Sequence, residues 1–265
     1  MSLLAVNNLG IATGGQDLVA DLSFAIEPGQ RLGLIGESGS GKSLTAMAIT
    51  GLLPPAIVPR GSVTLDGVEV IGAPERKLNQ LRGAASAVVF QEPLTALDPL
   101  MKLGNQLAEP LHRRFRREGR DLANIDAEII ALLERVSLPQ PQRIANAYPY
   151  EVSGGQRQRV AIAMALACRP KLLIADEPTT ALDVTTQAEI LALLDSLVRD
   201  LGMALLFISH DLPVVSTIVD QVLVLRQGRM VETGPVKTVL GAPQHQYTQS
   251  LVAAARAFDS ALGAS

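Results

Sequence analysis

Eight consecutive residues carry the clearest chemical signal in the chain: Gly36-Glu37-Ser38-Gly39-Ser40-Gly41-Lys42-Ser43. They fit the pattern G-x-x-x-x-G-K-[ST], in which glycines let the backbone wrap around phosphate groups without a Cβ atom in the way. Lys42 would reach the β- and γ-phosphates of a nucleotide, and the Ser43 hydroxyl would bind Mg²⁺. A strand is predicted at 31–35 and a helix from residue 44, so backbone N–H groups at the helix N-terminus would also face the anion.

A pair of acidic residues is the second candidate. Asp176 and Glu177 follow the apolar run 172–175, which predicts a buried strand. Ligands of open α/β sheets bind at the carboxyl ends of strands. Asp176 would therefore hold Mg²⁺, directly or through water, and Glu177 would polarise the water that attacks the γ-phosphorus. The alternative is a pair of acids in a solvated loop, which the presence of the phosphate loop disfavours.

The third candidate is a glycine-rich helix start, Ser153-Gly154-Gly155-Gln156. Ser153 can cap the helix, and the free N–H groups behind the glycines would offer a second anion site. For these four residues taken alone, an ordinary capped helix is the commoner explanation.

The elements that must position these residues alternate between strands and helices. This alternation predicts an α/β fold with a parallel core sheet and helices on both of its faces. The Asp-Gly turn within 62–71 predicts a hairpin, and the Leu, Ala, Arg, Glu and Gln content of 94–158 has helical periodicity. The predicted organisation is a core from 1–93 and 159–235, an inserted helical segment at 94–158, and a short helical tail at 236–265.

Composition argues against several classes of protein. A net charge of −3, a pI of about 5.7 and an aromatic content of 3% argue against a nucleic-acid partner. Cys168 is the single cysteine, so no disulfide forms within the chain and a reducing compartment is expected. We expect no signal peptide, because the N-terminus lacks a basic segment. We also expect no membrane span, because no uncharged apolar run reaches about 18 residues.

The order of the motifs along the chain supports a family assignment. Gln91 follows the apolar run 87–90, Asp183 follows the acidic pair, and His210 follows the apolar run 204–208. This order resembles that of the ATP-binding subunits of ABC transporters over about residues 3–240. The resemblance implies hydrolysis of ATP with Mg²⁺ on a P-loop NTPase (RecA-like) core. It also implies an N-terminal antiparallel β subdomain and an inserted α-helical subdomain.

The resemblance further implies a role for each matching position. Ser153–Gln156 (the signature segment) would bind ATP held by the phosphate loop of an opposite subunit. The catalytic residues would be Lys42, Glu177 and His210, and the Mg²⁺ ligands would be Ser43, Gln91 and Asp176. The nucleotide-binding residues would be Gly36, Glu37, Ser38, Gly39, Ser40, Gly41, Lys42, Ser43, Thr45, Gln91, Ser153, Gly154, Gly155, Gln156 and Asp183.

Residues 90–99, 148–151 and 242–248 resemble the corresponding segments of dipeptide, oligopeptide and nickel importer ATPases. Residues 36–54 resemble the first-type ATPase of the heterodimeric pairs in that group. The resemblance implies a peripheral position at the cytoplasmic face of the inner membrane. The implied partners are permease subunits, a paralogous second ATPase subunit (a homodimer being possible in isolation) and, indirectly, an extracytoplasmic solute-binding protein.

Several alternatives stay open at this point. The chain could be a non-transport ABC-type ATPase with a regulatory, assembly or DNA-repair role. Residues 10–15 offer no aromatic ring to stack on adenine, so selectivity for ATP over GTP is open. The transported solute, peptide or nickel, is also open. The basic run 112–120 predicts a solvated helix end, and its alternative is contact with anionic lipid or an acidic permease loop.

Overall fold

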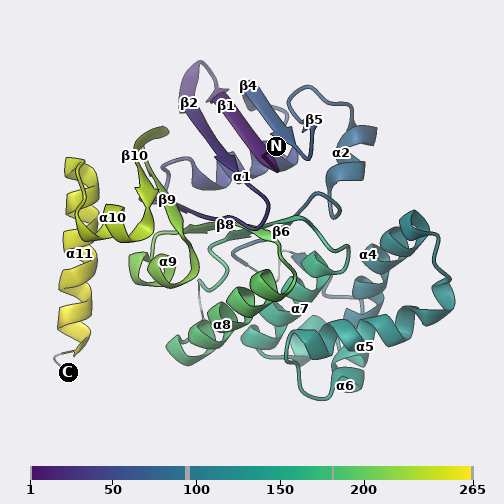
Figure 1. Cartoon of the computed structure of the whole chain (residues 1–265). Helices are drawn as coiled ribbons and strands as arrows, with labels where there is room; N and C mark the ends of the chain where they lie inside the picture. Colours follow the sequence, from purple (N-terminus) through teal and green to yellow (C-terminus); the bar gives the residue numbers. More distant parts are fainter. Residues whose placement is uncertain (1, 93–95, 181, 264–265) are drawn as a thin grey trace. The chain divides into compact units, whose positions relative to one another are not determined.

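A computed structural model describes residues 2–92, 96–180 and 182–263 of the chain (Figure 1). The chain forms two compact units. One comprises the segments up to Leu81 and from Met203 onward, and the other comprises Arg82–Gly202. Strands alternate with helices as the sequence predicts, and the parallel and antiparallel sheets of a P-loop NTPase fold are both present. The predicted domain boundaries at 94 and 158 stay a prediction.

The first unit begins with a four-stranded antiparallel sheet in the order β2-β1-β4-β5. Its apolar side chains, such as Leu4, Val6, Leu9 and Ile11 of β1, are buried, and register shifts between β1 and β2 interrupt a strict alternation. The turn at Asp66-Gly67 has positive φ at both residues, 50° and 77°, which a two-residue hairpin needs. The predicted hairpin is thus confirmed. The four strands are β1 (Leu4–Thr13), β2 (Gln16–Ile26), β4 (Val58–Leu65) and β5 (Val68–Glu69).

The parallel part of the first unit positions the phosphate loop. Strand β3 (Arg31–Ile35) lies between β8 (Ala204–Ser209) and β9 (Gln221–Arg226) and is parallel to both, while β10 (Arg229–Pro235) is antiparallel to β9. Nearly every residue of β3, β8 and β9 is buried, as expected for strands covered on both faces.

Helices complete the first unit. A Cβ atom at Gly33 would lie 2.9 Å from a methyl group of Val215, so glycine permits the close packing of β3 on α9. In the tail, α11 extends over 18 residues. The helices are α1 (Lys42–Thr50), α2 (Glu75–Leu81), α9 (Leu212–Ile218), α10 (Val236–Gly241) and α11 (Gln246–Gly263).

The second unit combines two parallel strands with a cluster of helices. Strand β6 (Ser86–Val89) pairs in parallel with β7 (Leu172–Asp176), and α7 packs on β6. Helices α4, α5 and α6 pack against one another (Figure 1). The helical elements are α4 (Leu103–Glu118), η1 (Leu122–Asn124), α5 (Ile125–Arg135), α6 (Pro141–Asn146), η2 (Pro149–Glu151), α7 (Gly154–Leu166) and α8 (Val184–Asp200).

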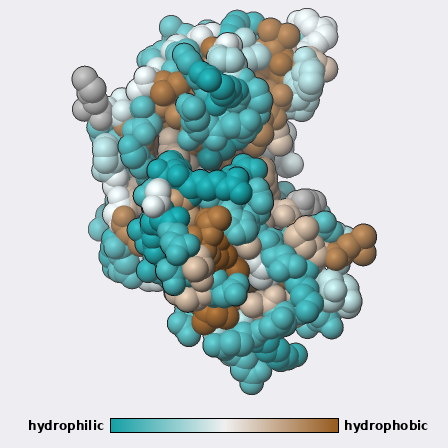
Figure 2. All heavy atoms as spheres, turned by 90° about the vertical axis from the view of Figure 1, so that its right-hand side faces the viewer, coloured by the Kyte–Doolittle hydropathy of each residue, from teal (hydrophilic) through white to brown (hydrophobic). Residues whose placement is uncertain are grey.

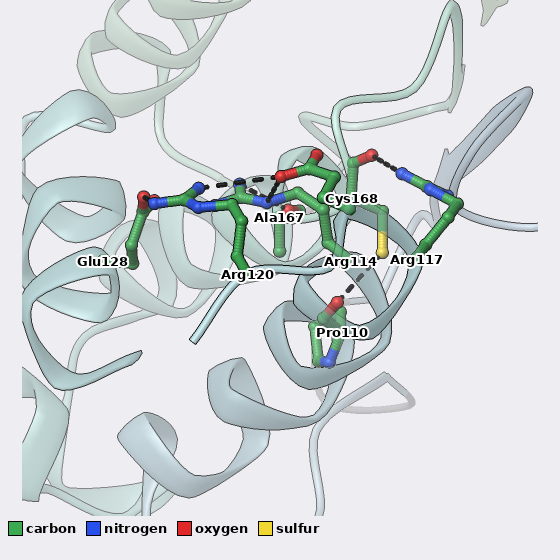
Figure 3. A network of polar contacts seen from close by, with 8 residues as sticks. Pro110, Arg114, Arg117, Arg120, Glu128, Ala167 and Cys168 are labelled. Atoms are coloured by element: carbon green, nitrogen blue, oxygen red, sulfur yellow. Dashed lines mark hydrogen bonds and ion pairs between the residues drawn. The ribbon is translucent and has the colours of Figure 1, made fainter. Parts of the chain in front are cut away.

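The basic run on α4 is only partly solvated, which corrects the sequence-based expectation. Arg114 is 1% exposed; it donates to the carbonyl oxygen of Ala167 and to the Glu128 carboxylate, both at 2.9 Å. Arg120 donates to the other Glu128 oxygen at 3.0 Å, and Arg117 donates to the carbonyl oxygen of Cys168 at 3.0 Å. These arginines therefore join α4 to α5 and to the C-terminal end of α7 (Figure 3).

The surface of the chain is mainly hydrophilic on the face shown in Figure 2, with hydrophobic residues exposed between the polar ones. Among the residues that the structure describes, no helix combines the length and the apolar composition that crossing a membrane requires.

Candidate nucleotide site

The phosphate loop connects β3 to α1, as the sequence predicts. Its glycines have positive φ: 153° at Gly36, 78° at Gly39 and 101° at Gly41. A Cβ atom at Gly36 would lie 2.2 Å from the carbonyl oxygen of Leu225, and one at Gly41 would lie 2.7 Å from a methyl group of Val19. No atom lies within 4 Å of a Cβ position at Gly39. The loop thus packs closely against neighbouring residues at Gly36 and Gly41, and the space beside Gly39 is open.

The start of α1 suits a phosphate group. Gly41 occupies the N-cap position, and no side chain there accepts a hydrogen bond from the first turn. The first turn of α1 is consequently not satisfied by a capping side chain, and such helix N-termini are common anion sites. The first turn contains no acidic residue that would repel an anion. The backbone at this end of the helix therefore fits a nucleotide phosphate.

Lys42 and Thr45 both fold back onto the loop. The Lys42 Nζ donates to the carbonyl oxygens of Gly36 at 2.8 Å and Glu37 at 2.9 Å. The ammonium charge is therefore held against the loop, where a bound phosphate would sit. Thr45 is fully buried, and its hydroxyl donates to the carbonyl oxygen of Gly41 at 2.9 Å. The Thr45 hydroxyl thus binds the residue that precedes α1, and the predicted role of Thr45 in nucleotide binding stays a prediction.

His210 lies at the same sheet edge as the phosphate loop. Ile35, which precedes the loop, is paired with Ser209, which precedes His210, in the parallel register of β3 and β8. His210 itself is exposed. The Ser209 hydroxyl accepts from the N–H of Asp211 at 3.0 Å, and the Asp211 carboxylate caps α9. The strand end and the helix start therefore fix the backbone on either side of His210.

In the second unit, Asp176 is the last residue of the buried strand β7, and Glu177 follows it. Asp176 is 8% exposed, and Glu177 has a positive φ of 47°, which is uncommon for a residue with a side chain. The Thr180 hydroxyl donates to the Glu177 carboxylate at 3.1 Å, and the Thr180 N–H donates to the Glu177 carbonyl oxygen at 3.3 Å. Strained backbone held by such contacts is found most often at functional sites. Thr180 was not among the predicted site residues, although it stands one turn after Glu177.

Gln91 lies at the same edge as the acidic pair. Val89, two residues before Gln91, is paired with Ala175, one residue before Asp176, in the register of β6 and β7. Because both strands are parallel, their carboxyl ends meet at one edge. Gln91 is exposed there, so its amide is available to a ligand.

The signature segment is a capping box at the start of α7. Ser153 accepts from the N–H of Gln156 at 3.3 Å, and the Gln156 side chain accepts from the N–H of Ser153 at 3.0 Å. A Cβ atom at Gly155 would lie 2.6 Å from the Thr186 methyl group, whereas one at Gly154 would meet nothing closer than 3.7 Å. Gly155 therefore allows the starts of α7 and α8 to pack closely.

Thr186 also forms hydrogen bonds with Asp183, the N-cap of α8. The Asp183 carboxylate accepts from the N–H of Thr186 at 2.9 Å and from its hydroxyl at 2.7 Å. These two bonds hold the pKa of Asp183 below its usual value, so the side chain is an anion at neutral pH. Thr186 thus links Asp183 to Gly155, a connection that the sequence motifs did not indicate.

Each unit consequently carries part of the predicted site. Within the described ranges, no group of three or more His, Cys, Asp and Glu side chains could hold a metal ion by itself. The predicted Mg²⁺ ligands Ser43, Gln91 and Asp176 supply only one carboxylate. This donor set fits an ion that shares its coordination with nucleotide phosphates, which is the usual arrangement for Mg²⁺.

An apolar pocket of about 310 Å³ lies in the second unit between β6, α4 and α7. Its lining includes Phe90, the residue before Gln91, together with residues of both helices. Arg113 and Glu109 contribute charged groups at its wall. The residue before Gln91 and residues of α4 and α7 therefore line the same pocket.

Comparisons with known proteins find similar sequences and similar folds. Residues 19–180 match the family model described as ABC transporter. The chain is 47% identical to the oligopeptide transport ATP-binding protein OppD of Salmonella typhimurium over 97% of its own length and 77% of that protein. It is 48% identical to the peptidoglycan transport ATP-binding protein YejF of Agrobacterium fabrum and 46% identical to the glutathione import ATP-binding protein GsiA of Shigella dysenteriae. The chain spans 47% and 42% of the lengths of these two relatives.

Solved structures share the fold. One is the dimeric ATP-binding cassette MJ0796 in a post-hydrolysis state bound to ADP and Pi, with a TM-score of 0.77 and 28% identity over 88% of this chain and 98% of that one. Another is cbiO1 from Clostridium perfringens, part of a transporter complex, with a TM-score of 0.75 and 26% identity over 91% of each chain.

Proposed function

Because this chain belongs to the ABC transporter family, we propose that it is the ATP-hydrolysing subunit of an importer that takes up peptides through a separate membrane permease. The chain is an ATPase of the Mg²⁺-dependent kind that this family comprises. The relatives reported above are named for the transport of oligopeptides, peptidoglycan and glutathione, which favours a peptide-like solute over nickel.

One observation carries the proposal: over 97% of its length the chain is 47% identical to an oligopeptide transport ATP-binding protein, and it spans 77% of that protein. We infer that each ATP binds between the phosphate loop of one subunit and the signature segment of another. The dimeric cassette with ADP and Pi is consistent with such pairing.

The residues in each part have distinct chemical tasks in this proposal. Phosphoryl transfer to water depends mainly on positioning and on stabilisation of charge. Lys42 and His210 would stabilise charge on the γ-phosphate, and Mg²⁺ bound by Ser43, Gln91 and Asp176 would neutralise the phosphate oxygens. Glu177, held by Thr180, would accept a proton from the attacking water.

We infer that the second ATPase subunit is a paralogue rather than a second copy. The resemblance of residues 36–54 to first-type subunits supports this inference.

The apolar pocket is the proposed docking site for the permease. It combines an apolar lining with Glu109 and Arg113, and it is continuous with the residue before Gln91. A permease helix inserted there would move the Gln91 segment when ATP binds or is hydrolysed. The chain would thus act peripherally at the cytoplasmic face of the inner membrane, with an extracytoplasmic solute-binding protein delivering the cargo to the permease.

Purification of the chain from membranes tests this proposal. The chain, tagged and expressed with its genomic neighbours, should co-purify with permease subunits and a second ATPase, and peptide should stimulate its ATP hydrolysis in proteoliposomes. ATP turnover without any membrane partner and without solute dependence would support a regulatory, assembly or DNA-repair ATPase instead.

A further inference from the structure

The segment before α11 is fixed by a carboxylate of β10. Glu232 accepts from the N–H of Gln244 at 2.9 Å and from the N–H of His245 at 3.0 Å. His245 in turn accepts, through Nδ1, from the N–H of Tyr247 at 3.1 Å. A chain of hydrogen bonds therefore sets the position of Tyr247 at the beginning of the helix.

Tyr247 is buried, and its hydroxyl reaches the phosphate loop. The residue is 5% exposed, and the guanidinium carbon of Arg226 lies 5.0 Å from the centroid of its ring. The hydroxyl oxygen accepts from the backbone N–H of Glu37 at 3.0 Å. This contact joins residues 210 positions apart in the sequence. The ring of Tyr247 is packed, and its hydroxyl finds a hydrogen-bond partner, as is usual for a buried tyrosine.

The hydrogen bond falls on one particular peptide group of the loop. The N–H of Glu37 and the carbonyl oxygen of Gly36 belong to the same planar peptide unit. Tyr247 binds the N–H of that unit, and Lys42 binds its carbonyl oxygen at 2.8 Å. The two side chains thus fix the orientation of a single peptide plane from its two polar groups.

Glycine makes this peptide plane easy to reorient. Gly36 has no Cβ atom and adopts a φ of 153°, so its backbone has more accessible conformations than any other residue would have. A rotation of the plane would also move an oxygen atom that Lys42 uses. By holding this peptide plane, the Tyr247 hydroxyl therefore helps to fix the position of Lys42, the lysine that would contact the nucleotide.

We propose that Tyr247 is a positioning residue for nucleotide binding, which holds the Gly36–Glu37 peptide of the phosphate loop and through it Lys42. The segment 244–248 is on this proposal a part of the nucleotide site, although it lies outside every motif of that site in the sequence. The proposal concerns ATP binding alone and does not depend on the transported solute.

Tyr247→Phe tests the proposal because it removes the hydroxyl and keeps the ring. The loss of one acceptor from a backbone N–H should weaken MgATP binding to the purified chain about 3- to 10-fold, as measured by isothermal titration calorimetry. The amide of Glu37 should exchange with deuterium faster in the variant without nucleotide, while amides of α11 keep their exchange rates. These two results together would support a positioning role.

Arg226→Gln is the matched control. It removes the cation from the face of the same ring and leaves the Tyr247 hydroxyl in place. MgATP affinity within twofold of the unmodified chain is expected. An equal loss of affinity in this control would overturn the proposal, because packing of the ring would then be responsible. Unchanged affinity in Tyr247→Phe, an unchanged exchange rate at Glu37, or faster exchange throughout α11 would each overturn it as well.

Discussion

The guanidinium of Arg114 donates to the carbonyl oxygen of Ala167 at 2.9 Å, and Ala167 is the C-cap of α7. A cation at a helix C-terminus binds otherwise unsatisfied carbonyl groups and opposes the helix dipole. Helix α7, which starts at the signature segment, is therefore capped at its C-terminal end by Arg114 of α4.

Replacing Arg114 should destabilise the chain strongly. Arg114→Met would leave the Glu128 carboxylate with one partner fewer and the Ala167 carbonyl oxygen without this donor, at a cost of about 2–4 kcal/mol. Arg113, on the same helix, forms an exposed ion pair with Glu109, so Arg113→Met should cost less than about 1 kcal/mol. Urea unfolding of both variants measures the difference. Equal effects would show that the buried network contributes no more than a surface pair.

The same network predicts that the stability of the folded chain depends on pH. Burial alone would raise the pKa of Glu128, but hydrogen bonds from Arg114 and Arg120 outweigh it and hold the pKa below the usual 4.5. A depressed folded-state pKa contributes stability that is complete above the unfolded value and is lost as the pH falls through the folded value. The unmodified chain should therefore lose stability as the pH drops below about 4.5.

Glu128→Gln isolates this contribution. The variant should be less stable than the unmodified chain at pH 7, and the gap between them should narrow as the pH falls below about 4.5. Glu134→Gln, an exposed change on the same helix α5, is the matched control for the loss of a carboxylate. If the stabilities of Glu128→Gln and of the unmodified chain changed with pH in parallel, the loss of stability at low pH would not come from Glu128.

The two glycines of the signature segment should differ in their tolerance of a methyl group. Gly155→Ala would place Cβ 2.6 Å from the Thr186 methyl group, and overpacking of this kind costs about 1–3 kcal/mol. Gly154→Ala meets only ordinary contacts and should be neutral or slightly stabilising. Thr186→Ser removes the methyl group and keeps the hydroxyl, so it should restore stability in the Gly155→Ala background. Chemical denaturation of the four proteins tests all three expectations.

The Glu177 side chain should act on the chemical step. Glu177→Gln keeps the shape and the contact with Thr180 but cannot take a proton from water. Hydrolysis should fall roughly 10²- to 10⁴-fold, while MgATP affinity stays within a few-fold. Single-turnover hydrolysis and nucleotide titration separate these effects. Near-normal turnover would remove Glu177 from the mechanism.

Lys42→Ala should act on binding. The variant loses the charge near the phosphates and also two hydrogen bonds that hold the loop, to Gly36 and Glu37. Nucleotide affinity should drop by at least about tenfold, since hydrogen bonds to charged groups contribute about 1.5–3 kcal/mol each. Calorimetric titration with MgATP provides the measurement. Unchanged affinity would contradict the assignment of residues 36–43 as the phosphate site.

Local signals predicted the elements near the site. The apolar run at 31–35 stands between a Pro-Gly turn and Gly36, and β3 has those limits. The turn at Asp66-Gly67 needs residues that tolerate positive φ, and both supply it. The assignment of single residues to catalysis and metal binding rests on the order of motifs and stays a prediction.

Contacts between distant parts of the chain could not be predicted in the same way. Arg114 looks like a solvated residue in a basic run, because its acceptor Ala167 is 53 positions away. Tyr247 gives no sign in the sequence of its contact with Glu37, since the hydroxyl finds a backbone group rather than a complementary side chain.

Helix α7 has 13 residues, so it is a rod about 20 Å long. One end carries the signature segment, and the C-terminal half lines the apolar pocket through Ala161, Met164 and Ala165. Protein interiors have low compressibility and transmit strain. A partner bound in the pocket would therefore touch the same helix that begins at the signature segment, while Arg114 and Arg117 of α4 bind the backbone at its C-terminal end.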